Sequence, residues 1–280
     1  MINLISSGQK EELNKNGFLI IRNVFTNEEV TKLTKHCSSK CSLLSYEKSV
    51  PGDVFDVPEL RTILFKKEII NLMKEVLNNE VTYFRDSQIH CKPNRRIFHT
   101  DAREDYKNPR KSVYPIYRLG VFLQDHKDFS GGIKFRTNSH RRIIFNKLAL
   151  KNLLTGKGFH NDLKVYLNTG KIVNARTRLG DLVIWNLRTE HSGGAVLPKF
   201  NNDSAFLPRI DQYLPRSLKL PEHENRMSIF YAFGHNSQEL DDYVNYKKKN
   251  VNDLEHRNSL STQIDVLSEQ AKGMGFSLEP

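Results

Sequence analysis

From about residue 81 onward, the chain is a succession of short β-rich segments separated by glycine, asparagine and proline. No amphipathic helix of crossover length lies between most of them, which disfavours parallel pairing through βαβ units. The pattern predicts an antiparallel sandwich or barrel. The expected strands are 81–85, 88–92, 116–123, 132–135, 165–167, 172–173, 182–185 and 227–233.

The first 80 residues have helical rather than strand periodicity. A short helix is expected from about residue 8, followed by a strand within 17–22. Thr26-Asn27-Glu28-Glu29 has the form of a capping box, because the threonine can accept from the first turn while the last glutamate reaches back. The helix it opens should end near Ser38. Apolar residues at helical spacing predict a second helix at about 60–78.

The sequence predicts one domain over 1–280, since it contains no internal repeat and no low-complexity linker. Its expected parts are a helical region at about 1–80, a β core at about 81–235 and a helical tail at about 236–280. The N-terminal helices should buttress one face of the core. For the tail, a docking helix is favoured over an oligomerisation element.

The formal net charge is +11 and the isoelectric point is about 9.5, which raises nucleic acid and anionic ligands as partners. The basic residues are spread along the chain, and the only pure run is Lys247-Lys248-Lys249. Solvated surface is the favoured interpretation for most of this charge, ahead of attraction to an anionic substrate. No stretch approaches the roughly 18 apolar residues of a spanning helix, so no membrane partner is expected.

Three cysteines provide no framework of evenly paired bridges, which fits a reducing compartment and a cytoplasmic location. Cys37 and Cys41 lie four apart on an expected helix face. Small packing residues are favoured over a redox or zinc role for them, because no further cysteine completes a zinc set.

Two histidines and one carboxylate suggest a metal site: His99 and Asp101 in one place, and His191 far downstream. This is the facial triad of non-heme Fe(II) enzymes, which leaves coordination positions for a co-substrate and oxygen. The His-x-Asp pattern also occurs at 126–128 and 160–162. Context selects the first copy, because it lies 92 positions before His191 (191 minus 99) and most of a sheet separates the two. His126 lies in a polar turn and is predicted to be a surface histidine.

Four segments in this order resemble the phytanoyl-CoA dioxygenase family of Fe(II)/2-oxoglutarate oxygenases. They are an entry strand and helix at 16–30, the pair at 99–101, a Gly-Gly strand at 131–141 and the distal-histidine strand at 180–194. In the third segment Asn138 stands where the family has glycine. The resemblance implies a double-stranded β-helix (jelly-roll, cupin-like) core, with Fe(II), 2-oxoglutarate and O2 at the site.

The resemblance also implies roles beyond the triad. Arg226, at the start of the last core strand, would pair with the far carboxylate of 2-oxoglutarate, and Ser228 would point to the same side of that strand. Gln88 and Arg118 fall where the family places side chains against co-substrate or substrate. Either of these two could equally face solvent on an alternating strand.

A departure from the family lies between the distal histidine and the arginine. Arg226 follows His191 by 35 positions (226 minus 191), and the proline-containing stretch 197–225 looks like an inserted loop. Two interpretations of this loop are equally favoured: a lid over the metal site, and a surface loop with no role at the site. Arg209 and Arg216 in this loop are rivals for the carboxylate, although neither begins a strand.

The implied reaction is oxidation of a small molecule with release of succinate and CO2. Hydroxylation, or a related desaturation or cyclisation, is favoured over halogenation because Asp101 is intact. Two alternatives remain: a non-catalytic jelly-roll binding protein, and a nucleic-acid dealkylase that uses the same iron chemistry. The dealkylase is less favoured, because no compact basic patch is interleaved with aromatic residues.

Overall fold

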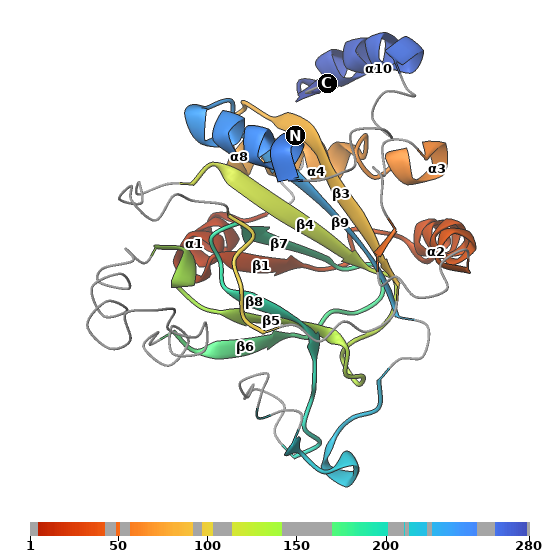
Figure 1. Cartoon of the computed structure of the whole chain (residues 1–280), viewed down its shortest axis with the longest axis vertical. Helices are drawn as coiled ribbons and strands as arrows, with labels where there is room; N and C mark the ends of the chain where they lie inside the picture. Colours follow the sequence, from red (N-terminus) through yellow and green to blue (C-terminus); the bar gives the residue numbers. More distant parts are fainter. Residues whose placement is uncertain are drawn as a thin grey trace.

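The computed structural model describes most of the chain and divides it into two β-sheets with flanking helices (Figure 1). The described residues are 5–42, 49–50, 57–91, 97–102, 114–141, 170–200, 210, 213–222, 226–250 and 261–278. The expected strand at 165–167 lies outside them.

The larger sheet has the strand order β1-β7-β4-β9-β3-β10, with β2 also paired to β3. All its pairings are antiparallel except that of β10 with β3. Its strands are β1 (Phe18–Ile21), β2 (Ser49–Val50), β3 (Thr82–Cys91), β4 (Ile116–Phe122), β7 (Leu182–Asn186), β9 (Met227–Gly234) and β10 (Ser277–Leu278).

The smaller sheet is antiparallel, with the order β6-β5-β8. Its strands are β5 (Gly132–Arg136), β6 (Ile172–Ala175) and β8 (His191–Ala195). Side chains from both sheets meet in one buried cluster, in which Phe18 stacks on Phe135 with ring centroids 4.3 Å apart. The antiparallel sandwich predicted from the sequence is therefore confirmed, and its two facing sheets form the double-stranded β-helix.

Alternation along the strands gives the larger sheet two different faces. On β4, Leu119 and Val121 join the cluster under the helices, whereas Phe122 joins the cluster between the sheets. On β9, Ile229 and Phe230 divide in the same way. Because side chains alternate with a period of two, every second residue of these strands faces the smaller sheet. Polar residues at such positions form the pocket described below.

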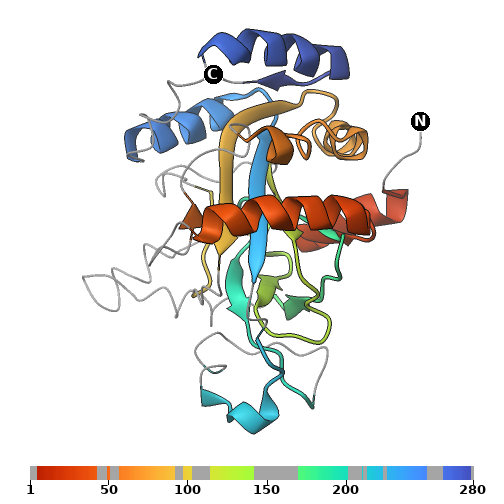
Figure 2. The ribbon, with the colours of Figure 1, turned by 90° about the vertical axis from the view of Figure 1, so that its right-hand side faces the viewer.

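Four helices precede the core and pack with the outer face of the larger sheet, as expected: α1 (Ser7–Asn16), α2 (Asn27–Ser42), α3 (Pro58–Arg61) and α4 (Lys67–Val76). Figure 2 shows α2 lying across this face. The predicted capping box is present: the Thr26 N–H donates to Glu29 Oε2 over 2.8 Å, and the Glu29 N–H donates to Thr26 Oγ1 over 3.2 Å. The helix continues four residues beyond the predicted end (42 minus 38).

The single helix predicted at 60–78 is wrong, because α3 and α4 are separate. Between them the chain makes tight i to i+3 bonds, including Ile63 N–H to the Leu60 carbonyl over 3.1 Å. Lys66 then takes an extended conformation before α4 begins. The break re-aims the chain, so that Ile63 and Ile69 are both buried in the core. Apolar spacing alone did not reveal this change of axis.

The tail docks on the core, as the sequence favoured. Helix α8 (Gln238–Asn250) buries Leu240 and Tyr243 in a cluster with Phe84, and α10 (Ser261–Met274) buries Ala271 beneath the larger sheet. The short strand β10 was not predicted. Among the described residues, no helix combines the length and the apolar composition needed to cross a membrane.

Two of the three cysteines form a disulfide, which corrects the sequence prediction. Cys41 at the end of α2 is joined to Cys91 at the end of β3, with Cα atoms 5.8 Å apart, whereas Cys37 is free and buried. Cys37 therefore is the packing residue that was predicted, and Cys41 is not. The pairing removes the cysteine count as an argument for a reducing compartment.

Thiol counting tests this arrangement directly. The native protein should react with no equivalents of a thiol reagent at pH 8, because burial raises the pKa of the Cys37 thiol to about 12. The unfolded, unreduced protein should react with one equivalent, and the unfolded, reduced protein with all three. Three equivalents from unfolded protein before reduction would contradict the disulfide.

Candidate metal site

The histidines His99 and His191 face each other across an antiparallel bridge next to β8. The His99 N–H donates to the His191 carbonyl over 3.0 Å, and the His191 N–H donates to the His99 carbonyl over 2.9 Å. Two residues further on, the Asp101 N–H is anchored to the Leu187 carbonyl over 3.0 Å. These bonds place one ligand atom from each of the three side chains within 4.8 Å of the others.

Both imidazoles have the same ring nitrogen available to a metal. Nδ1 of His99 lies 2.9 Å from the Ile97 carbonyl, and Nδ1 of His191 lies 3.0 Å from the Thr189 carbonyl. A carbonyl can only accept, so these contacts select the tautomer in which Nδ1 carries the proton and Nε2 has a free lone pair. The two Nε2 atoms lie 3.9 and 3.5 Å from oxygens of Asp101. The donor set and its tautomers suit a divalent cation.

The charge states also suit metal binding. Burial by itself would raise the pKa of Asp101, but the charge of Arg118, together with the two histidines, outweighs burial and holds that pKa below its usual value. Burial lowers the pKa of His191 to about 4. At neutral pH the site therefore offers a carboxylate and a neutral imidazole, which are the protonation states of metal ligands.

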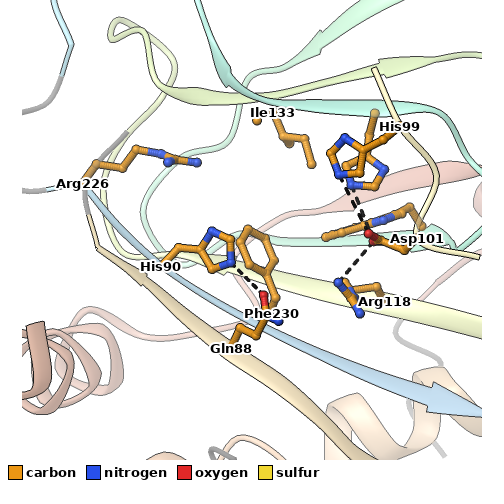
Figure 3. Close-up of a pocket in the computed structure, with 11 residues that line it drawn as sticks. Gln88, His90, His99, Asp101, Arg118, Ile133, Arg226 and Phe230 are labelled. Atoms are coloured by element: carbon orange, nitrogen blue, oxygen red, sulfur yellow. Dashed lines mark hydrogen bonds and ion pairs between the residues drawn. The ribbon is translucent and has the colours of Figure 1, made fainter. Parts of the chain in front are cut away.

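The triad lies at one side of a pocket between the two sheets (Figure 3). Gln88, Arg118 and Arg226, which the sequence placed near the co-substrate or substrate, all line it. Ser228 is not among the lining residues. It is fully buried on β9, and its hydroxyl has no hydrogen-bond partner among the described residues. The remaining lining residues are His90, Ile133, Trp185, Gly193 and Phe230.

Arg226 reaches into the pocket from the side opposite the triad (Figure 3), and a glycine gives it room. A Cβ atom on Gly131 would lie 3.2 Å from Arg226 Cδ, and Gly131 itself has a φ of 108°, which disfavours other residues. His126 lies beside the same glycine and is only 1% exposed. The prediction of a surface histidine is therefore wrong, since the polar turn around His126 folds inward.

The predicted turn at 138–140 supports the distal histidine. Asn138 has a φ of 61°, a left-handed conformation that asparagine tolerates better than most residues, which explains how it replaces glycine. The next residue, Ser139, accepts a hydrogen bond from the Glu190 N–H over 2.9 Å. The turn thereby fixes the backbone immediately before His191.

Sequence reasoning missed His90, which lines the pocket from β3. Its Nε2 lies 3.0 Å from Gln88 Oε1, and its ring meets Phe230 edge to face with centroids 4.9 Å apart. Gln88 and His90 are two residues apart on one strand, so they share a face. That spacing was the signal that could have identified His90 once Gln88 was a candidate.

Of the stretch 197–225 the structure describes 197–200, 210 and 213–222, and within these residues Pro198 pairs with Lys219 in an antiparallel bridge. None of its described residues lines the pocket. Of the two rival arginines, Arg216 is exposed in the short helix η3 (Arg216–Leu218), and Arg209 lies outside the described residues.

Comparison with known proteins identifies the fold. The curated ectoine dioxygenase of Bordetella bronchiseptica is 21% identical over 230 residues, which cover 72% of this chain and 74% of that protein. No protein-family profile matches. Among solved structures, the non-heme α-ketoglutarate-dependent carbocyclase SnoK from nogalamycin biosynthesis superposes with a TM-score of 0.58 at 15% identity, covering 82% of this chain and 84% of SnoK.

A second solved structure is EctD from S. alaskensis with 2-oxoglutarate and 5-hydroxyectoine, with a TM-score of 0.56 at 14% identity and coverage of 84% and 77%. A third is HygX from Streptomyces hygroscopicus with nickel and 2-oxoglutarate, with a TM-score of 0.56 at 14% identity and coverage of 83% and 88%. The fold is that of the non-heme iron, 2-oxoglutarate-dependent oxygenases. At these identities the likeness establishes the architecture, while the chemistry must be argued from the residues of this chain.

Proposed function

We propose that this chain is an Fe(II)/2-oxoglutarate-dependent dioxygenase that hydroxylates a small molecule and releases succinate and CO2. The observation that carries the proposal is the triad itself: two imidazoles with free Nε2 atoms and one ionised carboxylate converge at one side of the pocket between the sheets. The oxygenase fold and the ectoine dioxygenase relative support the same conclusion.

In this proposal His99, Asp101 and His191 hold the metal. Three protein ligands on one face leave the pocket side of the ion open to small molecules. When bound, Fe(II) with 2-oxoglutarate and O2 supplies the oxidising power for C–H hydroxylation. The bridge at β8 fixes His99 and His191, the Leu187 carbonyl anchors Asp101, and apolar lining residues such as Ile133 and Trp185 would limit the access of water.

Arg226 and Ser228 bind the far carboxylate of 2-oxoglutarate. A guanidinium pairs with a carboxylate through two parallel hydrogen bonds. Ser228 does not line the pocket, but it shares a face of β9 with the lining residue Phe230, and its hydroxyl lacks a partner among the described residues, so it would supply a third donor. Gln88 and Arg118 contribute to the co-substrate or substrate side of the same pocket. Together these residues orient the two reactants at the open face of the metal.

Within the oxygenases, we assign the chain to enzymes like phytanoyl-CoA dioxygenase. The four sequence segments that carry the resemblance support this assignment. Segments 99–101 and 180–194 contain the triad, Ser139 of 131–141 accepts from the Glu190 N–H, and the Gly17 carbonyl of 16–30 accepts from the Thr189 hydroxyl. We also infer that residues 1–280 act as one domain, since α8 and α10 both pack on the larger sheet or its edge.

Anaerobic titration of the metal-free protein tests the proposal. Fe(II) and 2-oxoglutarate added together should produce a weak visible charge-transfer band, and neither should produce it alone, because the band requires 2-oxoglutarate chelated to the iron. Oxygen admitted together with ascorbate should then abolish the band and form succinate and CO2, with the ascorbate supplying the two electrons that the substrate would otherwise provide. A folded protein that binds metal stoichiometrically without the band would overturn the proposal and favour a non-catalytic jelly-roll binding protein.

A further inference from the structure

Arg118 on β4 contacts two carboxylates at once. Its Nη1 lies 3.2 Å from Oδ2 of Asp101, and its Nη2 donates to Oδ2 of Asp86 on β3 (Figure 3 shows the first pair). Asp101 is the carboxylate of the triad, whereas Asp86 is not among the pocket-lining residues. The guanidinium therefore bridges the metal site and a second carboxylate behind it.

Helix α8 supplies the other two partners of the second carboxylate, Asp86. The Tyr243 hydroxyl donates to Asp86 Oδ2 over 2.8 Å, and Lys247 Nζ lies 3.1 Å from Asp86 Oδ1. Residues four apart lie on the same face of a helix, so one face of α8 supplies both groups. The sequence favoured solvated surface for most of the basic residues, but the Lys247 side chain is only 19% exposed.

Together the charged groups form an alternating, balanced chain: Asp101, Arg118, Asp86 and Lys247, two negative and two positive. Their side chains are between 4% and 19% exposed. Buried charges are tolerated when each has a partner, and removal of one leaves an uncompensated charge. This network extends from the metal ligand to the tail of the chain.

Asp86 determines how strongly Arg118 holds Asp101. If Asp101 were the sole partner of Arg118, the guanidinium would compete with a cation for the carboxylate. Asp86 pairs with one nitrogen of the guanidinium and Asp101 with another. Arg118 therefore orients the carboxylate of Asp101 without neutralising its negative charge fully, so that the carboxylate can still bind a cation. Lys247 and Tyr243 in turn stabilise Asp86, and the Tyr243 hydroxyl also accepts a hydrogen bond from Arg118 Nη2 over 3.3 Å.

We propose that Arg118 is a positioning residue for the metal-binding carboxylate of Asp101, and that Asp86, Tyr243 and Lys247 of the tail helix hold it in this role. The inference rests on the proposed metal site. Loss of such a partner costs a metal site about 10–100-fold in affinity, because the ligand must then be ordered when the metal binds. The tail thus takes part in metal binding although it lies outside the predicted β core.

Calorimetric titration of the metal-free protein with Co(II) tests the inference without turnover. Arg118→Met should weaken Co(II) binding by about 10–100-fold and alter the visible spectrum of the bound ion, which reports coordination geometry. Lys247→Met and Tyr243→Phe should weaken binding in the same direction by smaller factors. Lys272→Met, which removes an exposed lysine of α10 paired only with Glu269 among the described residues, is the matched control and should bind as wild type does.

A double-mutant comparison separates this network from a general effect of charge. In an Asp86→Asn background, adding Lys247→Met should change Co(II) affinity by less than about 2-fold, because Lys247 then has no carboxylate to balance. Unchanged or raised affinity in Arg118→Met and Lys247→Met, with binding still lost in Asp101→Ala, would overturn the inference alone. If Arg118→Met does not fold, Lys247→Met and Tyr243→Phe decide by the same criterion. Failure of the wild type to bind Co(II) would instead overturn the proposed function.

Discussion

Asp101→Ala is expected to lower Fe(II) affinity by more than about 100-fold, beyond the 10–100-fold that loss of an outer-sphere partner costs. Succinate formation should become undetectable. The alanine removes the only carboxylate of the triad and leaves Arg118 facing two histidines, so the site loses both a ligand and the charge that attracts the cation. His99→Ala and His191→Ala should behave in the same way. Anaerobic Fe(II) titration with the charge-transfer band as readout measures the effect.

The matched control for this prediction comes from the second copy of the same pattern. Asp128 ends another His-x-Asp sequence, and its side chain is 69% exposed in the turn before β5. Asp128→Ala should bind Fe(II) and turn over as wild type does. Retention of the band in Asp101→Ala would show that the metal is held elsewhere.

Arg226→Ala is expected to weaken 2-oxoglutarate binding by about 30-fold or more, which corresponds to the ~2–5 kcal/mol lost when one partner of a buried ion pair is removed. Metal binding should persist, because Arg226 lies across the pocket from the triad (Figure 3). Arg226→Lys should recover part of the loss, since lysine restores the charge but not the two-pronged geometry. The midpoint of the 2-oxoglutarate titration at saturating Fe(II) is the measurement.

Arg216→Ala provides the control, because this rival arginine is exposed outside the pocket. Its titration midpoint should equal that of wild type. A normal midpoint in Arg226→Ala, or a shifted one in Arg216→Ala, would transfer the carboxylate-binding role to another residue.

Features that depend only on residue type and on order along the chain could be predicted from the sequence. Histidine and aspartate are metal-ligating residue types, and separation by most of a sheet favoured His99, Asp101 and His191 over the copies at 126–128 and 160–162 as the candidate ligands. Period-two segments predicted the strands of the core, and Arg226 was placed at the start of β9. These features are local, so a short stretch of sequence carries enough information to predict them.

Pairings between distant segments were decided only by the tertiary structure. Arg118 meets Asp86 and Asp101 because β3, β4 and the bridge at His99 converge on one pocket, and no local pattern encodes that convergence. Lys247 meets Asp86 across 161 positions (247 minus 86), and Cys41 meets Cys91 across 50.

Burial of polar residues was likewise decided by packing. His126 lies in a polar turn and Lys247 in a basic run, which both favour solvent exposure. The fold nevertheless buries His126 and leaves the Lys247 side chain only 19% exposed, because neighbouring elements supply packing contacts or a countercharge. Periodicity reports which face of an element is apolar, but it does not report which partner covers a polar one. The sequence thus determined the candidate metal ligands and the strand pattern, whereas strand register and tail docking determined which side chains contact them.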